Sequence, residues 1–443
     1  MSCLWQDCVH AIFSVLSIAN DTLWEYVDFV IILAIGLYLT FKSKFFQVRT
    51  IFSPFETFKA LRHATHADTE CGLGPLRLYF TSMGGAIGIG NLGGVVAAVS
   101  IGGPGGLFWM WIAVFVGMLV KYAEIFLGIK YRIRNKSGGY DGGAMYYLAR
   151  AYNCKWVPAL FCVLMCIYGT EIYQFKVVQD ALVDTYGLNR IVVVVMMLAG
   201  TLYVTLGGIN RLAIICSTLM PFFLLLYACI SIYVIYKSDV EFFAMLADVV
   251  KSAFTGHAAV GGFVGSSFAT TVQQGMSNAV YSGDIGMGYD SVIQSETRII
   301  KPAVQARTAM FSLFTDCSIC SMTVLLVLST GQWKAGYAHG FDYLVAALSD
   351  YVPHVKQIIT VLFFLAGWTT ILGYQAVAMK SAKKLSEHGP MIYLCYAMVA
   401  FIAFSFVDQN FARMVMFVAG GVIVLVNLIG IFRLRHELEF TRW

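Results

Sequence analysis

The feature that most constrains the fold of this chain is a series of apolar segments, each about 20 residues long and almost free of charge. A helix of about 20 residues spans the roughly 30 Å hydrocarbon core of a bilayer. Hydrophobic residues make up 59% of the 443 residues and charged residues 12%, whereas a soluble domain carries roughly a quarter of charged residues. The pattern predicts an all-α polytopic membrane protein rather than a water-soluble fold.

Hydropathy predicts about eleven transmembrane helices along the chain. Their expected bounds are 27–41, 78–100, 105–130, 157–178, 191–206, 212–236, 258–287, 308–330, 358–380, 391–406 and 411–433. A further segment, 241–254, has apolar residues at helical spacing with a few charges between them. This pattern is typical of a helix that lies along the outer membrane interface.

Basic residues between the spans predict the orientation of the chain. Lys42, Lys44 and Arg49 follow the first span, and Arg132 and Arg134 follow the third. Loops rich in Lys and Arg stay in the cytoplasm, and all six basic segments agree with one topology when the sides alternate. We therefore expect an external N-terminus and a cytoplasmic C-terminus in the plasma (inner) membrane. The formal charge of +5 follows from this topology, so we expect the lipid bilayer as a partner and no nucleic acid.

The spans divide into two equal groups once the first is set aside. Five precede Lys237 and five follow it. Because each half has an odd number of spans, the second half starts on the opposite side of the membrane from the first and is inverted relative to it. This is the arrangement of an inverted repeat. The predicted single transporter domain, 1–443, then consists of an N-terminal helix and cytoplasmic loop (1–77), a first five-helix repeat (78–236), an external interfacial helix (237–257), a second five-helix repeat (258–433) and a cytoplasmic tail (434–443).

Glycines interrupt the first span of each repeat more than any other span. The first group is Gly84, Gly85, Gly88, Gly90, Gly93 and Gly94, and the second is Gly261, Gly262, Gly265, Gly275, Gly283, Gly286 and Gly288. Broken helices at corresponding positions of two repeats indicate a transport site.

The first glycine run contains a formal G-x-G-x-x-G motif, but a dinucleotide-binding turn needs a preceding strand. Here the run lies in a span without charge from Thr81 to Ser100. Tight helix packing is an alternative for the outer glycines, Gly84 and Gly94. Local unwinding at Gly88–Gly90 would expose amides that suit a carboxylate and carbonyls that suit a cation. A zwitterionic ligand carries a carboxylate for the amides and a positive charge for the carbonyls, so it suits both kinds of group.

Ionisable residues within membrane spans are costly and point to function. Those in the predicted spans are Lys121, Glu124, Glu171, Lys176, Asp284, Asp316 and Lys380. Lys121 and Glu124 lie three residues apart on one helix, so we expect them to pair as a structural or gating pair. Asp284, in the second broken segment, either binds a cation or proton or caps the break. For Asp316 a packing role and a functional role are equally compatible with its position.

Neutral polar groups supply further candidates. Gln174, between Tyr173 and Phe175, offers two donors and an acceptor in an apolar helix, which suits a ligand contact. Thr369 and Thr370 provide adjacent hydroxyls at mid-span, and such oxygens suit a small alkali cation. Alternatively, each hydroxyl bonds the carbonyl one helical turn back.

Several motifs together resemble the alanine or glycine:cation symporter family. They are Gly88-x-Gly90-Asn91-x-x-Gly94, Gly102-Gly103-Pro104-Gly105 with Phe108-Trp109-Met110-Trp111, Lys121-Tyr122-Ala123-Glu124 and Gly142-Gly143-x-Met145-Tyr146-Tyr147. Weaker similarity follows at 174–182, 281–288 and 369–373. The resemblance implies the amino acid-polyamine-organocation superfamily, a leucine-transporter fold of two inverted five-helix repeats, and sodium-coupled import of alanine or glycine.

The resemblance also implies roles for individual residues. The amides of Ile89 and Gly90 would hold the substrate carboxylate with help from Gln174, while Tyr281 and Ser282 would contact the substrate. Gly88, Asn91 and Tyr374 belong to the same predicted substrate site. The implied sodium ligands are the carbonyls of Gly84 and Ile87 and the hydroxyls of Thr369 and Thr370. Sodium is the coupling ion, and no other cofactor or obligatory protein partner is implied.

The chain departs from the family pattern at or near this site. Ile89 stands where the family usually has Thr, Gly283-Asp284 where it has Asn-Glu, Ala144 where it has Pro, and Tyr374 where it has Trp. A proton-coupled carrier that uses Asp284 or Asp316 is therefore the alternative. A channel or a membrane-embedded enzyme is disfavoured, because the sequence shows no nucleophile–base pair or metal triad, and a channel needs no amino-acid site.

Overall fold

The computed structural model describes residues 14–20, 22–64, 72–135, 138–255, 268–406 and 409–440. The first half of the chain forms η1 (Leu23–Asp28), α2 (Phe29–Lys42), α3 (Phe46–Ile51), α4 (Pro54–Ala64), α5 (Pro75–Ala86), η2 (Gly90–Gly94), α6 (Val95–Gly102), α7 (Gly106–Lys130), β1 (Ile133–Arg134), β2 (Tyr140–Asp141), α8 (Ala144–Tyr152), α9 (Trp156–Tyr168), α10 (Ile172–Tyr186), α11 (Arg190–Leu206) and α12 (Gly208–Lys237). The second half forms α13 (Phe242–Thr255), α14 (Phe268–Ser282), α15 (Tyr289–Gln294), α16 (Pro302–Ala306), α17 (Thr308–Ser329), η3 (Gln332–Lys334), α18 (Gly340–Leu348), α19 (Val355–Leu385), α20 (Gly389–Phe404), α21 (Gln409–Arg433) and η4 (Arg435–Glu437).

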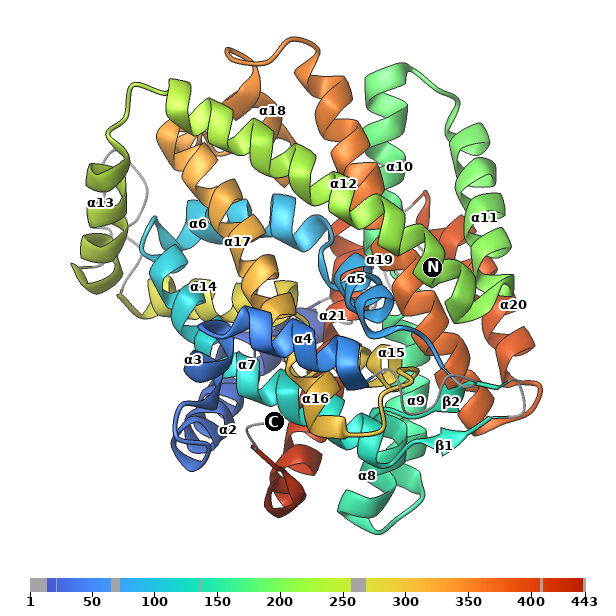
Figure 1. Ribbon diagram of the computed structural model, residues 1–443. Coiled ribbons are helices and arrows are strands. Elements are labelled where there is room, and N and C mark those ends of the chain that lie inside the picture. Colours follow the sequence, from blue (N-terminus) through green and yellow to red (C-terminus); the bar gives the residue numbers. More distant parts are fainter. Residues whose placement is uncertain are drawn as a thin grey trace.

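Helices occupy every predicted span that falls on the described residues, which confirms the all-α membrane fold (Figure 1). Six helical stretches among the described residues are long and apolar enough to cross a membrane, and a bent pair makes a seventh. Two shorter apolar helices, Arg190–Leu206 and Gly389–Phe404, match two more predicted spans. The helix expected at 241–254 is α13. The start of the span predicted at 258–287 lies outside the described residues, as do Gly261, Gly262 and Gly265.

The first helix of the first repeat is broken where the glycine run predicts it. Helix α5 ends at Ala86, Ile87 is extended with φ −83° and ψ 96°, and π-helical η2 begins at Gly90. The two halves, Pro75–Ala86 and Gly90–Gly102, meet at 54°. The helix therefore unwinds at Ile87 and Gly88, at the start of the predicted Gly88–Gly90 segment, and Ile89 and Gly90 are already helical.

The second glycine run breaks its helix as well. Helix α14 ends at Ser282, and α15 begins at Tyr289 after six residues without regular structure. Asp284, Gly286 and Gly288 have φ of 49°, 87° and 80°. Glycine adopts such left-handed backbone without steric cost, and Asp tolerates it better than most residues. The backbone can therefore reverse within the membrane at this point.

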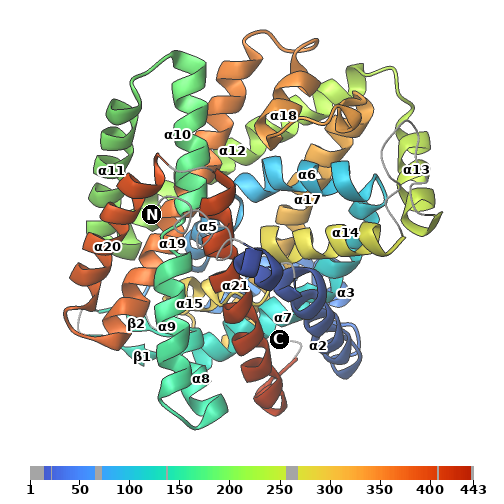
Figure 2. The same ribbon diagram turned by 180° about the vertical axis from the view of Figure 1, so that it is seen from behind.

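The two breaks lie side by side in the centre of the molecule. Helix α14 packs on α6 and α7, α15 packs on α5 and α7, and α19 packs on α5 and α10. Figure 2 shows α11 and α20 at the periphery, away from the breaks. Met196 of α11, Leu225 of α12 and Ile392 of α20 are exposed, as expected for helices that face lipid. The peripheral helices thus enclose a polar centre.

Lys121 and Glu124, both buried on α7, do not pair with each other as the sequence predicts. The Lys121 Nζ atom lies 2.7 Å from Asp290 Oδ2 and donates to the carbonyl of Gly283 at 2.7 Å. Glu124 accepts from the Gly288 amide at 2.9 Å and from Asn427 Nδ2 at 2.5 Å. The expectation was wrong because the unwound segment presents backbone groups that need partners, and α7 packs directly against it. The two side chains clamp both ends of the second break.

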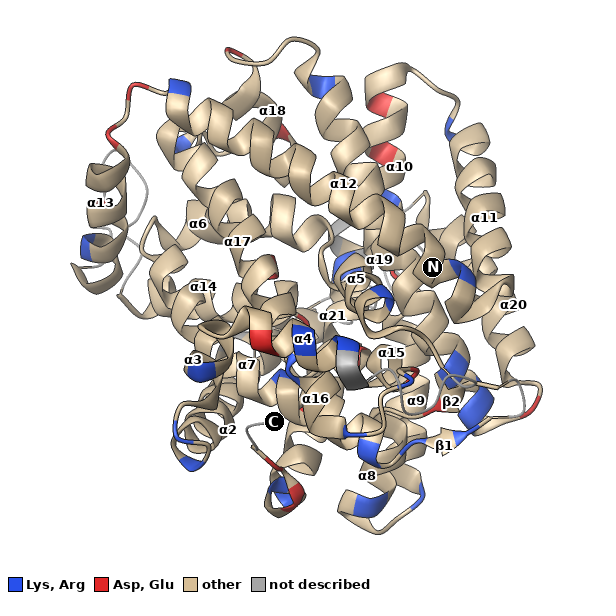
Figure 3. Ribbon diagram, in the orientation of Figure 1, with Lys and Arg blue, Asp and Glu red and all other residues tan. Residues whose placement is uncertain are grey.

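Ion pairs close the end of the molecule that holds the β1–β2 hairpin. Lys380 pairs with Glu296 and lies 3.6 Å from Asp141, and Lys383 pairs with Asp141 at 3.0 Å. Partial burial raises the pKa of Asp141, but the hydrogen bond from Lys383 and the two lysine charges outweigh it, so the pKa lies below its ordinary value. Figure 3 shows more Lys and Arg around α8 and the hairpin than around α18. This asymmetry matches the side that the sequence predicts to be cytoplasmic.

The clamp on the second break makes Lys121 important for stability. Lys121→Met leaves the buried Asp290 carboxylate without its counter-charge, which costs about 3–5 kcal/mol of unfolding free energy. We expect a lower thermal midpoint of the detergent-purified protein, and recovery of most of the loss when Asp290→Leu is added. Lys237→Met, at the exposed end of α12, is the matched control and should leave the midpoint unchanged. A Lys121→Met protein as stable as this control would contradict the assigned clamp.

Candidate functional site

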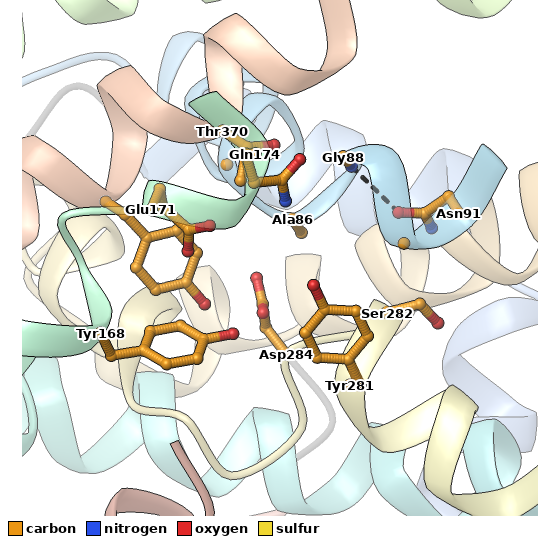
Figure 4. A pocket seen from close by; sticks show the side chains of 13 residues that line it. Ala86, Gly88, Asn91, Tyr168, Glu171, Gln174, Tyr281, Ser282, Asp284 and Thr370 are labelled. Atoms are coloured by element: carbon orange, nitrogen blue, oxygen red, sulfur yellow. Dashed lines mark hydrogen bonds between the residues drawn. The ribbon is translucent and has the colours of Figure 1, made fainter. Parts of the chain in front are cut away.

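A small enclosed cavity lies between the two broken helices (Figure 4). Its lining residues come from both breaks and from α9, α10 and α19, and they are Gly85, Ala86, Gly88, Gly90, Asn91, Tyr168, Glu171, Gln174, Tyr281, Ser282, Asp284, Thr370 and Tyr374. The space open to the centre of a water molecule is about 10 Å³, which is room for roughly one water. In this conformation the cavity is closed around a volume smaller than an amino acid.

The first break supplies backbone amides to this cavity. The Ile89 amide donates to Gln174 Oε1 at 3.0 Å, and the Gly88 amide donates to Asn91 Oδ1 at 3.0 Å. A Cβ atom on Gly88 would lie 2.7 Å from Gln174 Nε2 and 2.8 Å from Thr370 Oγ1, so a larger residue here would displace these two side chains. The Gln174 carbonyl oxygen therefore occupies the position at which a carboxylate oxygen would meet an unwound helix N-terminus.

The second break supplies a wall of hydroxyl and carboxylate groups. Tyr281 and Ser282 end α14, and Asp284 follows in the turn. Asp284 is 5% exposed, and its Oδ2 atom has no hydrogen-bond partner among the described residues. The Tyr374 hydroxyl, from α19, is likewise buried and interacts with the Asp284 carboxyl group. These groups can bind a donor or a cation inside the cavity.

Glu171 is a second acid in the cavity, and the sequence assigned it no role. It sits between α9 and α10 with φ 56°, is 1% exposed, and has an Oε2 atom without a hydrogen-bond partner in the described chain. Figure 4 shows its carboxylate turned into the cavity. Its spacing of three residues from Gln174 was the available signal, because residues three apart share a helix face. Tyr168, one turn earlier, was missed as well.

Three of the four predicted sodium ligands, Gly84, Ile87 and Thr370, lie together at the first break. Thr370 Oγ1 lies 3.4 Å from both the Gly84 and the Ile87 carbonyl oxygens, and it also donates to Ala366 O at 3.0 Å. Thr369 Oγ1 donates to Leu365 O at 2.8 Å and lies 3.7 Å from Met220 Sδ. Both hydroxyls therefore bond one turn back, and of the two it is Thr370 that reaches the carbonyls of the break. Neutral carbonyl and hydroxyl oxygens are a donor set that suits an alkali cation.

A cluster of three aromatic side chains, Trp24, Tyr281 and Phe417, borders a second, larger cavity of about 200 Å³. Gly90 and Tyr281 line both spaces. The Tyr281 ring lies 4.5 Å from that of Phe417 and 6.0 Å from that of Trp24, measured between centroids. Trp24 belongs to the additional N-terminal helix, so this helix contributes to closing the cavity on that side.

The structure gathers most of the predicted site residues and leaves some aside. Those that line the cavity are Gly88, Gly90, Asn91, Gln174, Tyr281, Ser282, Asp284, Thr370 and Tyr374. Ile89 contributes through its amide. Asp316 is not among the lining residues: its Oδ1 atom accepts from Asn91 Nδ2 at 2.6 Å, which is the packing role. Lys121 and Glu124 support the second break from behind.

Among solved structures, the fold is similar to that of a Na⁺-coupled sialic acid symporter, with a TM-score of 0.55 at 13% identity over 94% of this chain and 87% of that one. This similarity confirms the leucine-transporter-like fold predicted from the sequence.

Curated relatives are similar over nearly the whole chain. The probable sodium/glutamine symporter GlnT of Bacillus subtilis is 28% identical over 96% of this chain and 89% of its own length. The sodium/alanine symporter AgcS of Methanococcus maripaludis is 26% identical over 88% of this chain and 87% of its own. The model of the sodium:alanine symporter family matches residues 9–439. With its paired broken helices and the cavity between them, the chain is a membrane transporter that belongs to the sodium:alanine symporter family.

Proposed function

We propose that this transporter carries a small neutral amino acid, alanine or glycine, into the cell together with sodium. The observation that carries the proposal is the convergence of two broken helices on one cavity, beside which a neutral oxygen set lies at the first break. The names of the relatives from Bacillus subtilis and Methanococcus maripaludis pair sodium with glutamine and with alanine, which supports the same substrate class.

The substrate carboxylate is assigned to the amides of the first break. A carboxylate oxygen replaces Gln174 Oε1 at the Ile89 amide, and the Gln174 amide group then turns its donors toward the ligand. The substrate ammonium faces the opposite wall, where Asp284 and the Tyr374 hydroxyl lie in the same cavity. Ser282 and Tyr281 bound the remaining space, which favours a small side chain.

Sodium is assigned to the oxygens of Gly84, Ile87, Thr369 and Thr370. The Gly84 carbonyl lies in the last turn of α5, and the Ile87 carbonyl and the Ile89 amide lie at the break that follows, so sodium and carboxylate bind to adjoining backbone. Each ligand stabilises the segment geometry that the other needs, and this supplies a coupling free energy between them.

Closure on both sides suits alternating access. The aromatic side chains of Tyr281, Phe417 and Trp24 lie between the cavity and the larger space. The ion pairs of Lys380 and Lys383 lie at the opposite end. We assign the Lys- and Arg-rich end to the cytoplasm by the positive-inside rule, which places the N-terminus outside and the C-terminus inside. The membrane is then the plasma (inner) membrane.

A proton-coupled carrier is the second candidate, and the unpartnered Asp284 oxygen in the cavity is the observation that favours it. Asp316 fits this role less well, because it lies outside the cavity lining and bonds Asn91.

Purified protein in proteoliposomes tests the coupling directly. An inward sodium gradient at constant pH should drive uptake of labelled alanine or glycine above equilibrium, and replacement of sodium by choline should abolish it. Uptake that follows an imposed pH gradient at constant sodium would show that the transporter is coupled to protons instead of sodium.

Gln174→Ala tests the carboxylate site. The variant loses the side chain that meets the Ile89 amide and lines the cavity, so the KM for alanine should rise about tenfold, equivalent to about 1.4 kcal/mol. Gln179→Ala is the matched control, because Gln179 is a buried glutamine on the same helix that bonds Ser405 O instead. Its KM should stay at the wild-type value. An unchanged KM in folded Gln174→Ala would refute the placement.

Thr370→Val tests the sodium site while keeping the shape of the side chain. Removal of the hydroxyl that lies 3.4 Å from two break carbonyls should raise the sodium concentration for half-maximal uptake by about tenfold. Thr369→Val should raise it less, because the Thr369 hydroxyl bonds Leu365 O and contacts Met220 Sδ instead of the break carbonyls. Equal wild-type sodium dependence in both variants would remove these hydroxyls from the site.

A further inference from the structure

Two carboxylates face the same closed cavity. Glu171 enters from the break between α9 and α10, and Asp284 enters from the break between α14 and α15. They are 1% and 5% exposed, and each has an oxygen atom without a hydrogen-bond partner among the described residues. The electrostatic interaction between the two groups is repulsive. Figure 4 shows both carboxylates turned inward, with Tyr168 and Tyr281 beside them.

No cationic side chain balances these charges within the described lining of the cavity, which contains no Lys, Arg or His. Lys121 pairs with Asp290 and donates to the Gly283 carbonyl, and its charge also attracts Asp284. Arg413 lines the larger space on the far side of Tyr281. Burial of an unpaired charge is costly, so each acid ionises in the cavity only with a positive charge beside it, and an ammonium group of the substrate can supply that charge.

The proposed ligands supply one positive charge too few at this wall. Sodium is assigned to neutral oxygens at the first break, and the substrate carboxylate to the Ile89 amide. The ammonium of alanine or glycine can neutralise one of the two acids. If the ammonium pairs with Asp284, then Glu171, three residues before Gln174, remains without a partner.

We propose that Glu171 is a specificity residue that extends the substrate range to small amino acids with a second amino group. In such a substrate the α-ammonium meets one acid and the side-chain ammonium meets the other, so every charged group in the cavity has an opposite charge. This inference rests on the proposed amino-acid symport and adds a substrate class to it.

The test compares 2,4-diaminobutyrate with homoserine, which has a hydroxyl in place of the side-chain amino group. In sodium-driven proteoliposome uptake, the wild-type kcat/KM should be higher for 2,4-diaminobutyrate than for homoserine. Glu171→Gln keeps the shape and removes the charge, and it should lower this ratio by about tenfold. Asp184→Asn removes an exposed acid that lines an outer cavity, and it should leave the ratio unchanged.

A measurement on the wild-type protein needs no variant. In detergent with sodium, 2,4-diaminobutyrate should raise the thermal midpoint more than homoserine at equal concentration. A wild-type preference for homoserine in uptake and in the thermal shift, with alanine uptake still driven by sodium, would overturn the role of Glu171 and leave the proposed symport intact. Equal loss of the ratio in Asp184→Asn would also overturn it. Absence of sodium-driven uptake of any of these amino acids would overturn the proposed symport.

Discussion

A transmembrane helix that unwinds in the bilayer core exposes amide and carbonyl groups that lipid cannot hydrogen-bond. This protein unwinds two such helices side by side, and several of its buried polar side chains bond the exposed backbone groups. Asn91 and Gln174 accept from the amides of the first break. Lys121, Glu124 and Asn427 bond the backbone of the second break. The site exists because these partners hold the broken segments open.

The polar side chains divide into those that support the breaks and those that face the cavity. The support groups bond the backbone of the breaks and one another: Lys121 has a carboxylate and a carbonyl, and Asn427 has Glu124, Tyr147 and the Gly286 carbonyl. Cavity groups keep unpartnered atoms, as on Glu171 and Asp284. Unpaired polar atoms cost stability, and a ligand that pairs them recovers part of that cost on binding. The unsatisfied atoms of the cavity wall are therefore available to a ligand.

The same segments connect the site to both sides of the membrane. Tyr281 belongs to the helix that ends at the second break, and it also packs on Phe417 in the lining of the larger cavity. Helix α19 carries Thr370 at the first break and, at its far end, Lys380 and Lys383 in ion pairs. A change at either break thus moves elements that close the cavity, which is how occupancy can be linked to access.

The sequence by itself determined the membrane class, the positions of the helices and the two breaks, since uninterrupted apolar length and clustered glycines act locally. It also singled out Gln174 and Thr370, whose polarity is conspicuous in an apolar helix. Tertiary packing decided which helix each face meets. Spacing suggested that Lys121 pairs with Glu124, but both turn to α15 and the second break, about 160 residues away in sequence. In the sequence, Asp316 and Glu171 are both acids within predicted spans, and only the packing of distant helices placed one against Asn91 and the other in the cavity.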